Sequence, residues 1–419
     1  MAACDGPSDT LRPAAPNDLR ASLSVGTAQN PNPSAAMMSA LGKLIFTDKN
    51  LSLKKNQACV SCHDPAWGFT APSSDINNAG AVMGGSVHGR FGNRKPPSAA
   101  YASQAPVLYY DDEDETYVGG NFWDGRATGS RLGSPVAEQS QAPFINPAEQ
   151  ALPDKACVVY RVAHGTYGDK YAGAWGRSIF DVKFPSNING LCEKEGSTVK
   201  VSNNDQAAID LAYDRIAKSI AAFEGSSDVN QFSSKYDLWR QRKVHLTPQE
   251  ERGFKLYNGK ANCAACHPSD GDHALFTDYT YDNIGVPANP KNPARLADPT
   301  YRDLGVGGFQ GQPEHYGREK VPTLRNLDKR GFATGVKSYM HNGVFKSLEQ
   351  VVHFYNTRDV LPACKDVVHP QFGVNCWPEP EVLDNVNRDE LGHQGMTAAE
   401  EADLVAFLKT LSDGYSVGK

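Results

Sequence analysis

The chain of 419 residues suggests two domains, each long enough to bury its own core. Hydrophobic residues make up 40% and charged residues 21% of the sequence, which is typical of soluble globular proteins. A net charge of −6 argues against a nucleic-acid partner, and no apolar run is long enough to cross a membrane. We therefore expect neither a nucleic-acid-binding nor a transmembrane protein.

Residues 1–33 are rich in Pro, Asn, Ser and Ala and predict an irregular N-terminal tail. The opening Met1-Ala2-Ala3-Cys4 resembles the end of a lipoprotein signal, in which Cys4 would carry a lipid anchor. An idle thiol at Cys4 is the alternative, and the sequence does not decide between the two.

Two Cys-x-x-Cys-His pentads carry the clearest chemistry in the sequence. They comprise Cys59, Cys62 and His63 in the first half and Cys263, Cys266 and His267 in the second. The two thiols of such a pentad each add to a haem vinyl group, and the adjacent His is then held beneath the iron. Zinc also binds Cys-x-x-Cys pairs, but these pairs lie far apart and each has its own His. The sequence therefore predicts two covalently attached c-type haems with His63 and His267 as iron ligands.

Four further cysteines, an even number, indicate disulfide bonds. Haems of type c are attached outside the bacterial cytoplasm, so we expect an exported, periplasmic protein whose export signal has been removed. Disulfide bonds persist in such an oxidising compartment. Proximity favours the pairs Cys157–Cys192 and Cys364–Cys376, although other pairings stay open from the sequence alone.

Apolar residues at helical spacing predict a helix over 37–45, before the first pentad, and another over 209–223. Thr-x-x-Glu capping boxes predict that further helices begin at Thr247 and Thr397. Such apolar stripes are mostly packing surfaces, so we assign them to the core.

The predicted fold is mainly α, with two cytochrome-c-like haem domains and long irregular loops. We place the first domain at 34–235 and the second at 236–419, because the composition changes near residues 225–240. Segments 71–120 and 268–320 are rich in Gly, Pro and Asn and predict long loops. Loops of that length usually wrap a cofactor or bind a partner.

Four motifs between about residue 39 and residue 411 resemble the bacterial di-haem cytochrome c peroxidase and MauG superfamily. They are FWDGRATGS (122–130), EQSQAPFINPAEQ (138–150), VPTLRNLDKRG (321–331) and YMHNGVFKSLEQVVHFYN (339–356). The resemblance implies that the first domain carries a peroxide-reactive haem and the second an electron-transfer haem.

The resemblance also assigns roles to single residues. Trp123 matches the tryptophan that lies between the haems and relays electrons, although a lone tryptophan is more often a core residue. Gln139, Pro143 and Glu149 match the distal pocket of the first haem. Glu149 then moves a proton between the peroxide oxygens as their bond breaks, which a nearby carboxylate can do because it takes up and returns a proton.

Tyr355 is the residue that separates two branches of this superfamily. The resemblance implies a methionine at this position in ordinary peroxidases, and a tyrosine in MauG-like, including MbnH-type, enzymes. A phenolate ligand stabilises oxidised iron, which suits a haem that stores oxidising equivalents. A buried tyrosine without a metal role is the alternative, and His353 is a rival ligand.

Two further histidines lie near family positions. His88 is close to the histidine that caps the peroxide-reactive iron in conventional peroxidases, but a loop histidine is usually solvated. His341 matches a position beside the second haem and suits a hydrogen-bond donor better than a ligand.

The resemblance further implies a calcium ion between the domains, held by carbonyls near Lys320 and Pro322 and by an asparagine. Lys95 stands where that asparagine is expected, and an ammonium group offers calcium no oxygen. Asn93 is a possible substitute, so calcium stays an open expectation.

Taken with Tyr355, the resemblance predicts an enzyme that uses hydrogen peroxide to form a high-valent di-haem state. That state oxidises aromatic side chains, foremost Trp, of a partner protein by long-range electron transfer. The alternative is a peroxidase that reduces hydrogen peroxide with electrons from a small redox protein. A pure electron carrier is a third class, against which Gln139 and Glu149 around an open haem face argue.

Overall fold

The computed structural model describes residues 33–416. The predicted tail before residue 33, with Cys4 and its lipid-anchor prediction, lies outside the described residues. Within them the chain is mainly helical, as the sequence predicts, with two short antiparallel ladders.

The helices of the first half are α1 (Ala35–Thr47), α2 (Cys59–Cys62), α3 (Ser74–Asn78), α4 (Pro135–Ile145), α5 (Lys155–His164), α6 (Gly168–Trp175), α7 (Ile188–Glu193) and α8 (Asn203–Glu224). Those of the second half are α9 (Lys235–Arg240), α10 (Pro248–Tyr257), α11 (Pro293–Ala297), α12 (Gly305–Gln310), α13 (Leu348–Thr357) and α14 (Ala398–Lys409). The ladders pair β1 (Tyr109–Asp111) with β2 (Thr116–Val118), and β3 (Tyr281–Asp282) with β4 (Glu319–Lys320).

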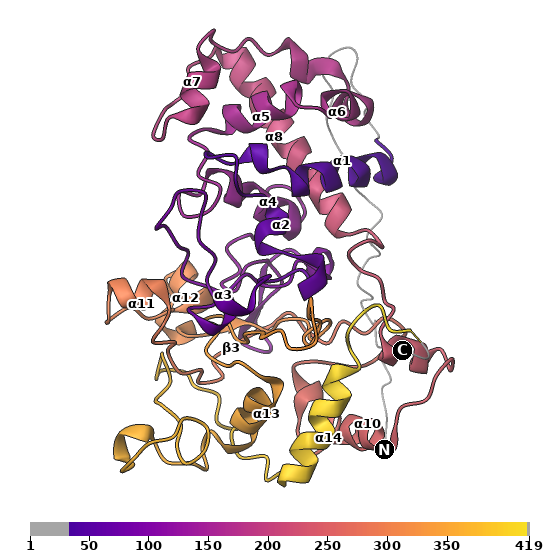
Figure 1. Ribbon diagram of the computed structural model, residues 1–419, viewed down its shortest axis with the longest axis vertical. Helices are drawn as coiled ribbons and strands as arrows, with labels where there is room; N and C mark the ends of the chain where they lie inside the picture. The colour runs from indigo at the N-terminus through magenta and orange to yellow at the C-terminus, as the bar shows by residue number, and fades with distance from the viewer. Residues whose placement is uncertain (1–32, 417–419) are drawn as a thin grey trace, which may run out of the picture.

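Two helical bodies lie one above the other along the long axis of the molecule (Figure 1). The upper body contains α1, α5, α6, α7 and α8, and the lower one contains α10, α13 and α14. The largest cluster of buried apolar side chains lies within residues 41–229, and the second largest within residues 236–411. The residues of one cluster all precede the proposed boundary at residue 235, and those of the other all follow it. The boundary itself stays a prediction.

The structure confirms the helices that the sequence patterns predict. The stripe over 37–45 lies inside α1, and that over 209–223 lies inside α8. Thr247 and Thr397 both form the predicted capping box, in which the threonine and the glutamate three residues later bond each other's backbone.

A glycine lets the central helices of each body touch backbone to backbone. A Cβ at Gly42 of α1 would lie 1.9 Å from the carbonyl oxygen of Ser219 in α8. A Cβ at Gly253 of α10 would lie 2.0 Å from the carbonyl oxygen of Asp403 in α14. Both helix pairs therefore cross more closely than a side chain at the glycine would permit.

Gly42→Ala is expected to lower the free energy of unfolding by about 1–3 kcal/mol, because α1 must move away from α8 and loosen the core around it. Gly190 in α7 is the matched control, since a Cβ there meets nothing within 4 Å. Gly190→Ala should leave stability unchanged or raise it by up to about 1 kcal/mol. Guanidinium denaturation of the two haem-loaded variants would measure both changes in the free energy of unfolding. Equal changes in the two variants would contradict the close contact at Gly42.

The two predicted loop segments, 71–120 and 268–320, meet between the bodies. Lys291 Nζ donates to the carbonyl of Asn78 at 3.2 Å, and Asn292 Nδ2 donates to the carbonyl of Asn93 at 2.7 Å. The segments are less irregular than predicted, since they contain α3, α11, α12 and the ladders. These elements are too short to show a period, and α11 begins through a local signal, the side chain of Asn292 followed by a proline.

Disulfide bonds join Cys157 to Cys192 and Cys364 to Cys376, the two pairs that proximity favours. The first ties α5 to α7. The second closes a loop beside Trp377, which packs against Phe345 and Phe354 of a smaller apolar cluster.

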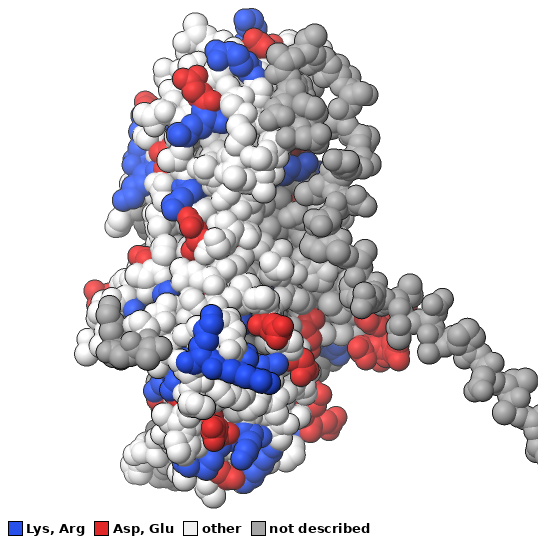
Figure 2. Space-filling view, turned by 90° about the vertical axis from the view of Figure 1, so that its right-hand side faces the viewer, with Lys and Arg blue, Asp and Glu red and all other residues white. Residues whose placement is uncertain are grey.

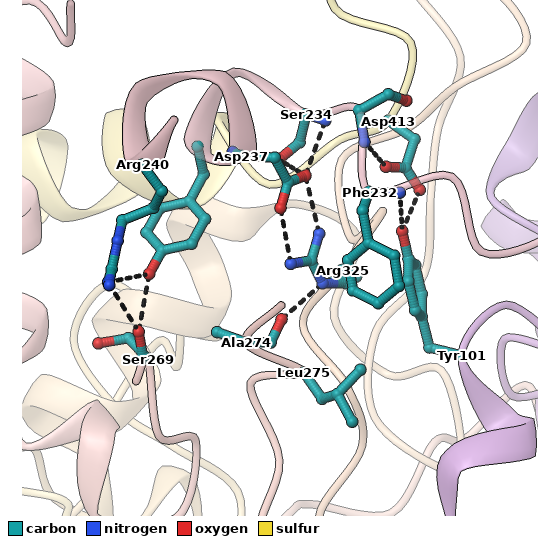
Figure 3. Close-up of polar contacts among 12 residues, drawn as sticks. Tyr101, Phe232, Ser234, Asp237, Arg240, Ser269, Ala274, Leu275, Arg325 and Asp413 are labelled. Carbon is teal, nitrogen blue, oxygen red and sulfur yellow. Dashed lines mark hydrogen bonds and ion pairs between the residues drawn. The ribbon is translucent and has the colours of Figure 1, made fainter. Parts of the chain in front are cut away.

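A buried arginine organises the seam between the bodies (Figure 3). Arg325 makes two hydrogen bonds to the carboxylate of Asp237, at 2.9 and 3.0 Å, and donates through Nε to the carbonyl of Ala274. Its guanidinium also lies over the rings of Tyr101 and Phe232. Because Tyr101 comes from the first half of the chain and Arg325 from the second, the contact joins both halves.

Tyr101 extends this seam toward the C-terminus. Its hydroxyl donates to Asp413 at 2.7 Å and accepts the backbone N–H of Phe232 at 3.0 Å. Asp413 also accepts the side chain of Asn326, which lies in the same segment as Arg325. The last described residues are thereby fixed against the loop that follows the first pentad.

The exterior carries charges of both signs. Figure 2 shows lysine and arginine side chains close to aspartate and glutamate side chains over the lower half of one face. Within residues 33–416 no helix is long and apolar enough to span a membrane.

Candidate haem-binding site

One cavity connects the two pentads. Its walls include the ligand histidine of each pentad, His63 and His267, together with Trp123, Gln139 and Tyr355. The rest of the lining comes largely from the loop segments between the bodies and from α13 and α14. The fold therefore brings residues from both pentads and from three further motifs to one continuous space.

The two pentad histidines are held in the same way. His63 Nδ1 lies 3.1 Å from the carbonyl of Phe69, and His267 Nδ1 lies 2.7 Å from the carbonyl of Phe276. A carbonyl only accepts, so Nδ1 carries the proton in both rings and Nε2 keeps its lone pair. Burial lowers the pKa of His267 to about 4 and also lowers that of His63. Both rings are thus neutral and oriented as metal ligands at neutral pH.

Trp123 lines the same cavity as the two histidines and is buried. Its indole Nε1–H donates to the carbonyl of Lys95 at 2.8 Å. The backbone N–H of Lys95 in turn donates to the carbonyl of His341 at 2.7 Å, and the His341 ring lies 6.4 Å from the indole. The position of Trp123 is therefore set by a loop that precedes it and by one from the second half.

The proposed distal residues lie on and after α4. Gln139 lines the cavity, Pro143 lies inside the helix, and Glu149 follows its C-terminal end. Burial raises the pKa of Glu149, against the charge of Arg126 and a 3.0 Å hydrogen bond from Asn146. Burial also raises the pKa of Cys62 to about 12, and the Glu149 carboxylate adds to that shift, so Glu149 lies near the first pentad.

Tyr355 and His353 project differently from α13. Tyr355 lines the cavity, and burial together with the nearby thiols of Cys266 and Cys263 raises its pKa. His353 instead bonds the carboxylate of Glu401 through Nδ1 at 2.9 Å and lies against Trp377. The two residues are two positions apart on a helix, which places them on different faces. Of the two, Tyr355 lines the cavity that His267 also lines, whereas His353 is engaged with Glu401.

His88 lies on the surface, where its side chain is exposed. This placement is that of a solvated loop histidine and does not support a ligand of the first haem.

The cavity also carries three lysines that suit an anionic cofactor, two of them buried and Lys320 half-buried. Lys95, Lys320 and Lys337 bond only neutral oxygens, such as Thr70 Oγ1 and the carbonyl of Gly120, and form no ion pair within residues 33–416. Burial lowers the pKa of Lys95 to about 8 and that of Lys320 to about 7. Haem propionates are carboxylates that could supply the missing negative charge, so the cavity fits two haems held by the pentads.

Comparison with known proteins decides the family. The family model described as di-haem cytochrome c peroxidase matches residues 36–245. The chain is 33% identical over 424 residues to the methylamine utilization protein MauG of Paracoccus denitrificans, covering 98% of this chain and 95% of that protein. The chain belongs to the di-haem cytochrome c peroxidase and MauG family. It is a haem peroxidase-type oxidoreductase with two c-type haems.

Solved structures agree with this assignment. The diheme peroxidase BthA from Burkholderia thailandensis matches with a TM-score of 0.69 and 28% identity, covering 91% of this chain and 87% of that one. A MauG-like protein associated with microbial copper homeostasis matches with a TM-score of 0.60 and 25% identity, covering 94% of this chain and 95% of that one.

The calcium expected from the family does not fit the side chains at its position. The ammonium of Lys95 points to Thr70 and the carbonyl of Pro96, and the side chain of Asn93 donates to the hydroxyl of Tyr301. Lys320 directs a second ammonium to the carbonyl of Gly120. Two buried positive charges stand where an oxygen-rich cage is needed.

Sequence reasoning missed the buried acids and bases of this di-haem family member. Glu224, at the end of α8, lines the cavity, and burial raises its pKa to about 8. Lys337 donates to three carbonyls, those of Trp67, Asn326 and Lys329. A charged residue in a helix or loop is expected to be solvated. The sequence offers only one weak signal of burial, the absence of an opposite charge nearby in the chain.

Proposed function

We propose that this protein is a periplasmic MauG-like enzyme that uses hydrogen peroxide to oxidise aromatic side chains, foremost Trp, of a partner protein at a distance. The observation that carries the proposal is Tyr355, which lines the cavity near the thiols of the second pentad. Its buried phenol suits a haem that stays oxidised, whereas a thioether would favour delivery of electrons.

The residues that would hold the haems are Cys59, Cys62 and His63, and Cys263, Cys266, His267 and Tyr355. When bound, the haems supply the redox chemistry that passes two electrons from an organic donor to peroxide, which becomes two molecules of water with two protons. The chain supplies the orientation of the ligands, the proton at the peroxide and a route for electrons. His63 and His267 are presented to the metal as neutral Nε2 ligands by the carbonyls of Phe69 and Phe276.

Glu149 is the proposed proton carrier at the first haem. Burial raises its pKa, so the carboxyl holds a proton more readily than a solvated one and can take a proton from one peroxide oxygen and return it to the other. Gln139 on α4 is the polar group of the cavity wall that would orient peroxide beside it.

Trp123 is the proposed electron relay. The indole is shielded from water and held by one hydrogen bond to Lys95, so it keeps a fixed position in the wall of the cavity that the two histidines share. Long-range transfer requires no substrate pocket at the iron, which agrees with a partner protein too large to enter the cavity.

Substitution of the proposed ligand tests this assignment. In Tyr355→Met the reduction potential of the second haem should rise, because a thioether favours ferrous iron where a phenolate favours ferric iron. Spectroelectrochemical titration of the haem-loaded protein would measure it, with Phe354→Leu on the same helix as the control that leaves the potential in place. An unchanged potential in Tyr355→Met would contradict ligation.

The second candidate is a peroxidase that reduces hydrogen peroxide with electrons from a small redox protein. The likeness to the diheme peroxidase BthA favours it. Steady turnover with a reduced small cytochrome or copper protein would distinguish it from oxidation of a specific protein partner.

A further inference from the structure

A further group of metal-ligand side chains lies in the wall of the same cavity, where β4, the turn before α12 and the loop before α13 meet. One ligand atom each of Asp303, Glu319 and His341 lies within 4.8 Å of the others. Asp303 and His341 are buried, and both carboxylate oxygens of Glu319 are closed off from solvent. The three come from separate segments that only the fold brings together.

Glu319 is the residue that lacks a partner. Neither of its oxygens accepts a hydrogen bond from any residue between 33 and 416. A buried carboxylate in that condition is strongly unfavourable, and it is relieved either by a proton or by a cation. Burial raises the pKa of Glu319, and the carboxylate of Asp303 adds to the shift. The geometry thus leaves an unfilled acceptor pointing into the cluster.

The positive charge nearby is already engaged. Arg94 donates through Nε and Nη2 to the two oxygens of Asp303, both at 2.5 Å, and through Nη1 to Asp124. Glu381 adds a further carboxylate, whose Oε2 accepts from Asn342 at 3.0 Å and lies 3.4 Å from His341 Nε2. Arg126 also pairs with Asp124, at 2.9 Å. The carboxylates of Asp124, Asp303, Glu319 and Glu381 still outnumber these two guanidinium groups, and haem propionates are anions that add to the excess.

We propose that Asp303, Glu319 and His341 bind one divalent first-row transition-metal ion of the zinc or manganese class. Two carboxylate oxygens and one imidazole nitrogen form a mixed donor set that these metals accept. Calcium and magnesium prefer oxygen alone, so the imidazole selects against them. Glu381 orients the imidazole from outside, as carboxylates do beside metal-bound histidines.

The position of the site gives it a role at Trp123. The carbonyl of His341 accepts the N–H of Lys95, whose own carbonyl accepts the indole N–H of Trp123. A metal ion on His341 therefore fixes the segment that holds the proposed relay. Its charge also opposes removal of an electron from the indole, whose ring lies 6.4 Å from the imidazole.

Metal content of the haem-loaded protein tests the proposal. The protein is equilibrated with zinc or manganese, dialysed against metal-free buffer and measured by plasma mass spectrometry, with its two irons as the internal standard. We expect one bound metal per two irons, and binding weakened at least ~100-fold in Glu319→Gln, because even the loss of an outer partner of a ligand costs 10–100-fold. Glu314→Gln, an exposed acid five positions earlier, is the matched control and should bind as the wild type does.

Glu319→Gln preserves the shape of the side chain, and an unchanged Soret spectrum with two haems per chain shows that it folds. Equal metal content in the wild type and Glu319→Gln would overturn the proposal, as would no bound metal in either. Calcium bound in preference to zinc would also overturn it. If neither protein binds metal, Glu319 shares a proton with Asp303, and the amide variant should match the wild type in thermal stability.

Discussion

Glu149→Gln is expected to lower the second-order rate constant for the reaction with hydrogen peroxide by about 10²–10⁴-fold, the usual contribution of a positioned acid–base group. The amide keeps the size of the side chain and can still contact Asn146, so haem loading should persist. Stopped-flow spectroscopy of the haem-loaded variant would measure the rate. Glu193→Gln is the control, because Glu193 is an exposed partner of Lys55 and should leave the rate unchanged.

The pH profile separates proton transfer from a structural effect. Burial raises the pKa of Glu149, so its basic form is lost at a higher pH than for a solvated carboxyl. The wild-type rate should fall as pH drops through that raised pKa, and Glu149→Gln should show no such step. A parallel pH dependence in both proteins would contradict the assigned role.

Asp237→Asn is expected to lower the free energy of unfolding by about 3–5 kcal/mol, because it leaves the guanidinium of Arg325 buried without its counter-charge. The side chains of Arg325 and Asp237 are only 0% and 1% exposed, so water cannot replace the lost partner. Denaturation of the haem-loaded protein would measure the loss. Asp228→Asn, which breaks the exposed pair with Lys43, should cost no more than about 1 kcal/mol.

This stabilisation should depend on pH. Burial alone would raise the pKa of Asp237, but the hydrogen bonds and charge of Arg325 outweigh it and hold that pKa below its usual range. A carboxyl whose pKa is depressed by folding contributes stability above its unfolded pKa, about 3.9, and that contribution is lost as pH falls through the folded pKa. The difference in the free energy of unfolding between the wild type and Asp237→Asn should therefore become smaller in acid. A difference in the free energy of unfolding that grows in acid would contradict the stabilising role of this ion pair.

Much of the fold follows from local signals in the sequence. The capping boxes at Thr247 and Thr397 and the apolar stripes inside α1 and α8 each depend on residues within a few turns of one another. The pentads likewise predict haem attachment from five consecutive residues. Such short-range patterns are readable because helix geometry fixes which residues share a face.

The candidate site is predictable only in part. Motif likeness reaches Trp123, Gln139 and Tyr355, which the fold brings to one cavity. The hydrogen bonds from His63 and His267 to backbone carbonyls could not be predicted. Every residue has a backbone carbonyl, so the sequence does not show which carbonyl faces the ring.

The buried charges were beyond sequence reasoning for another reason. From the sequence Lys95 stands out only as a missing calcium ligand, and nothing local shows that its ammonium is buried against Thr70 in the cavity wall. Glu319 is an ordinary acid in a loop until Asp303 and His341 arrive from segments before and after it. Contacts of this kind depend on tertiary packing, which local patterns do not encode.

The most direct test of the proposed function is the addition of one equivalent of hydrogen peroxide to the fully oxidised protein. The account predicts that the resting protein consumes the peroxide without prior reduction and then oxidises a partner or its own aromatic side chains. Tyr355→Met should lose this reaction until one haem has been reduced. A wild-type protein that consumes peroxide only after a reduction step would contradict the MauG-like account and identify a conventional di-haem peroxidase.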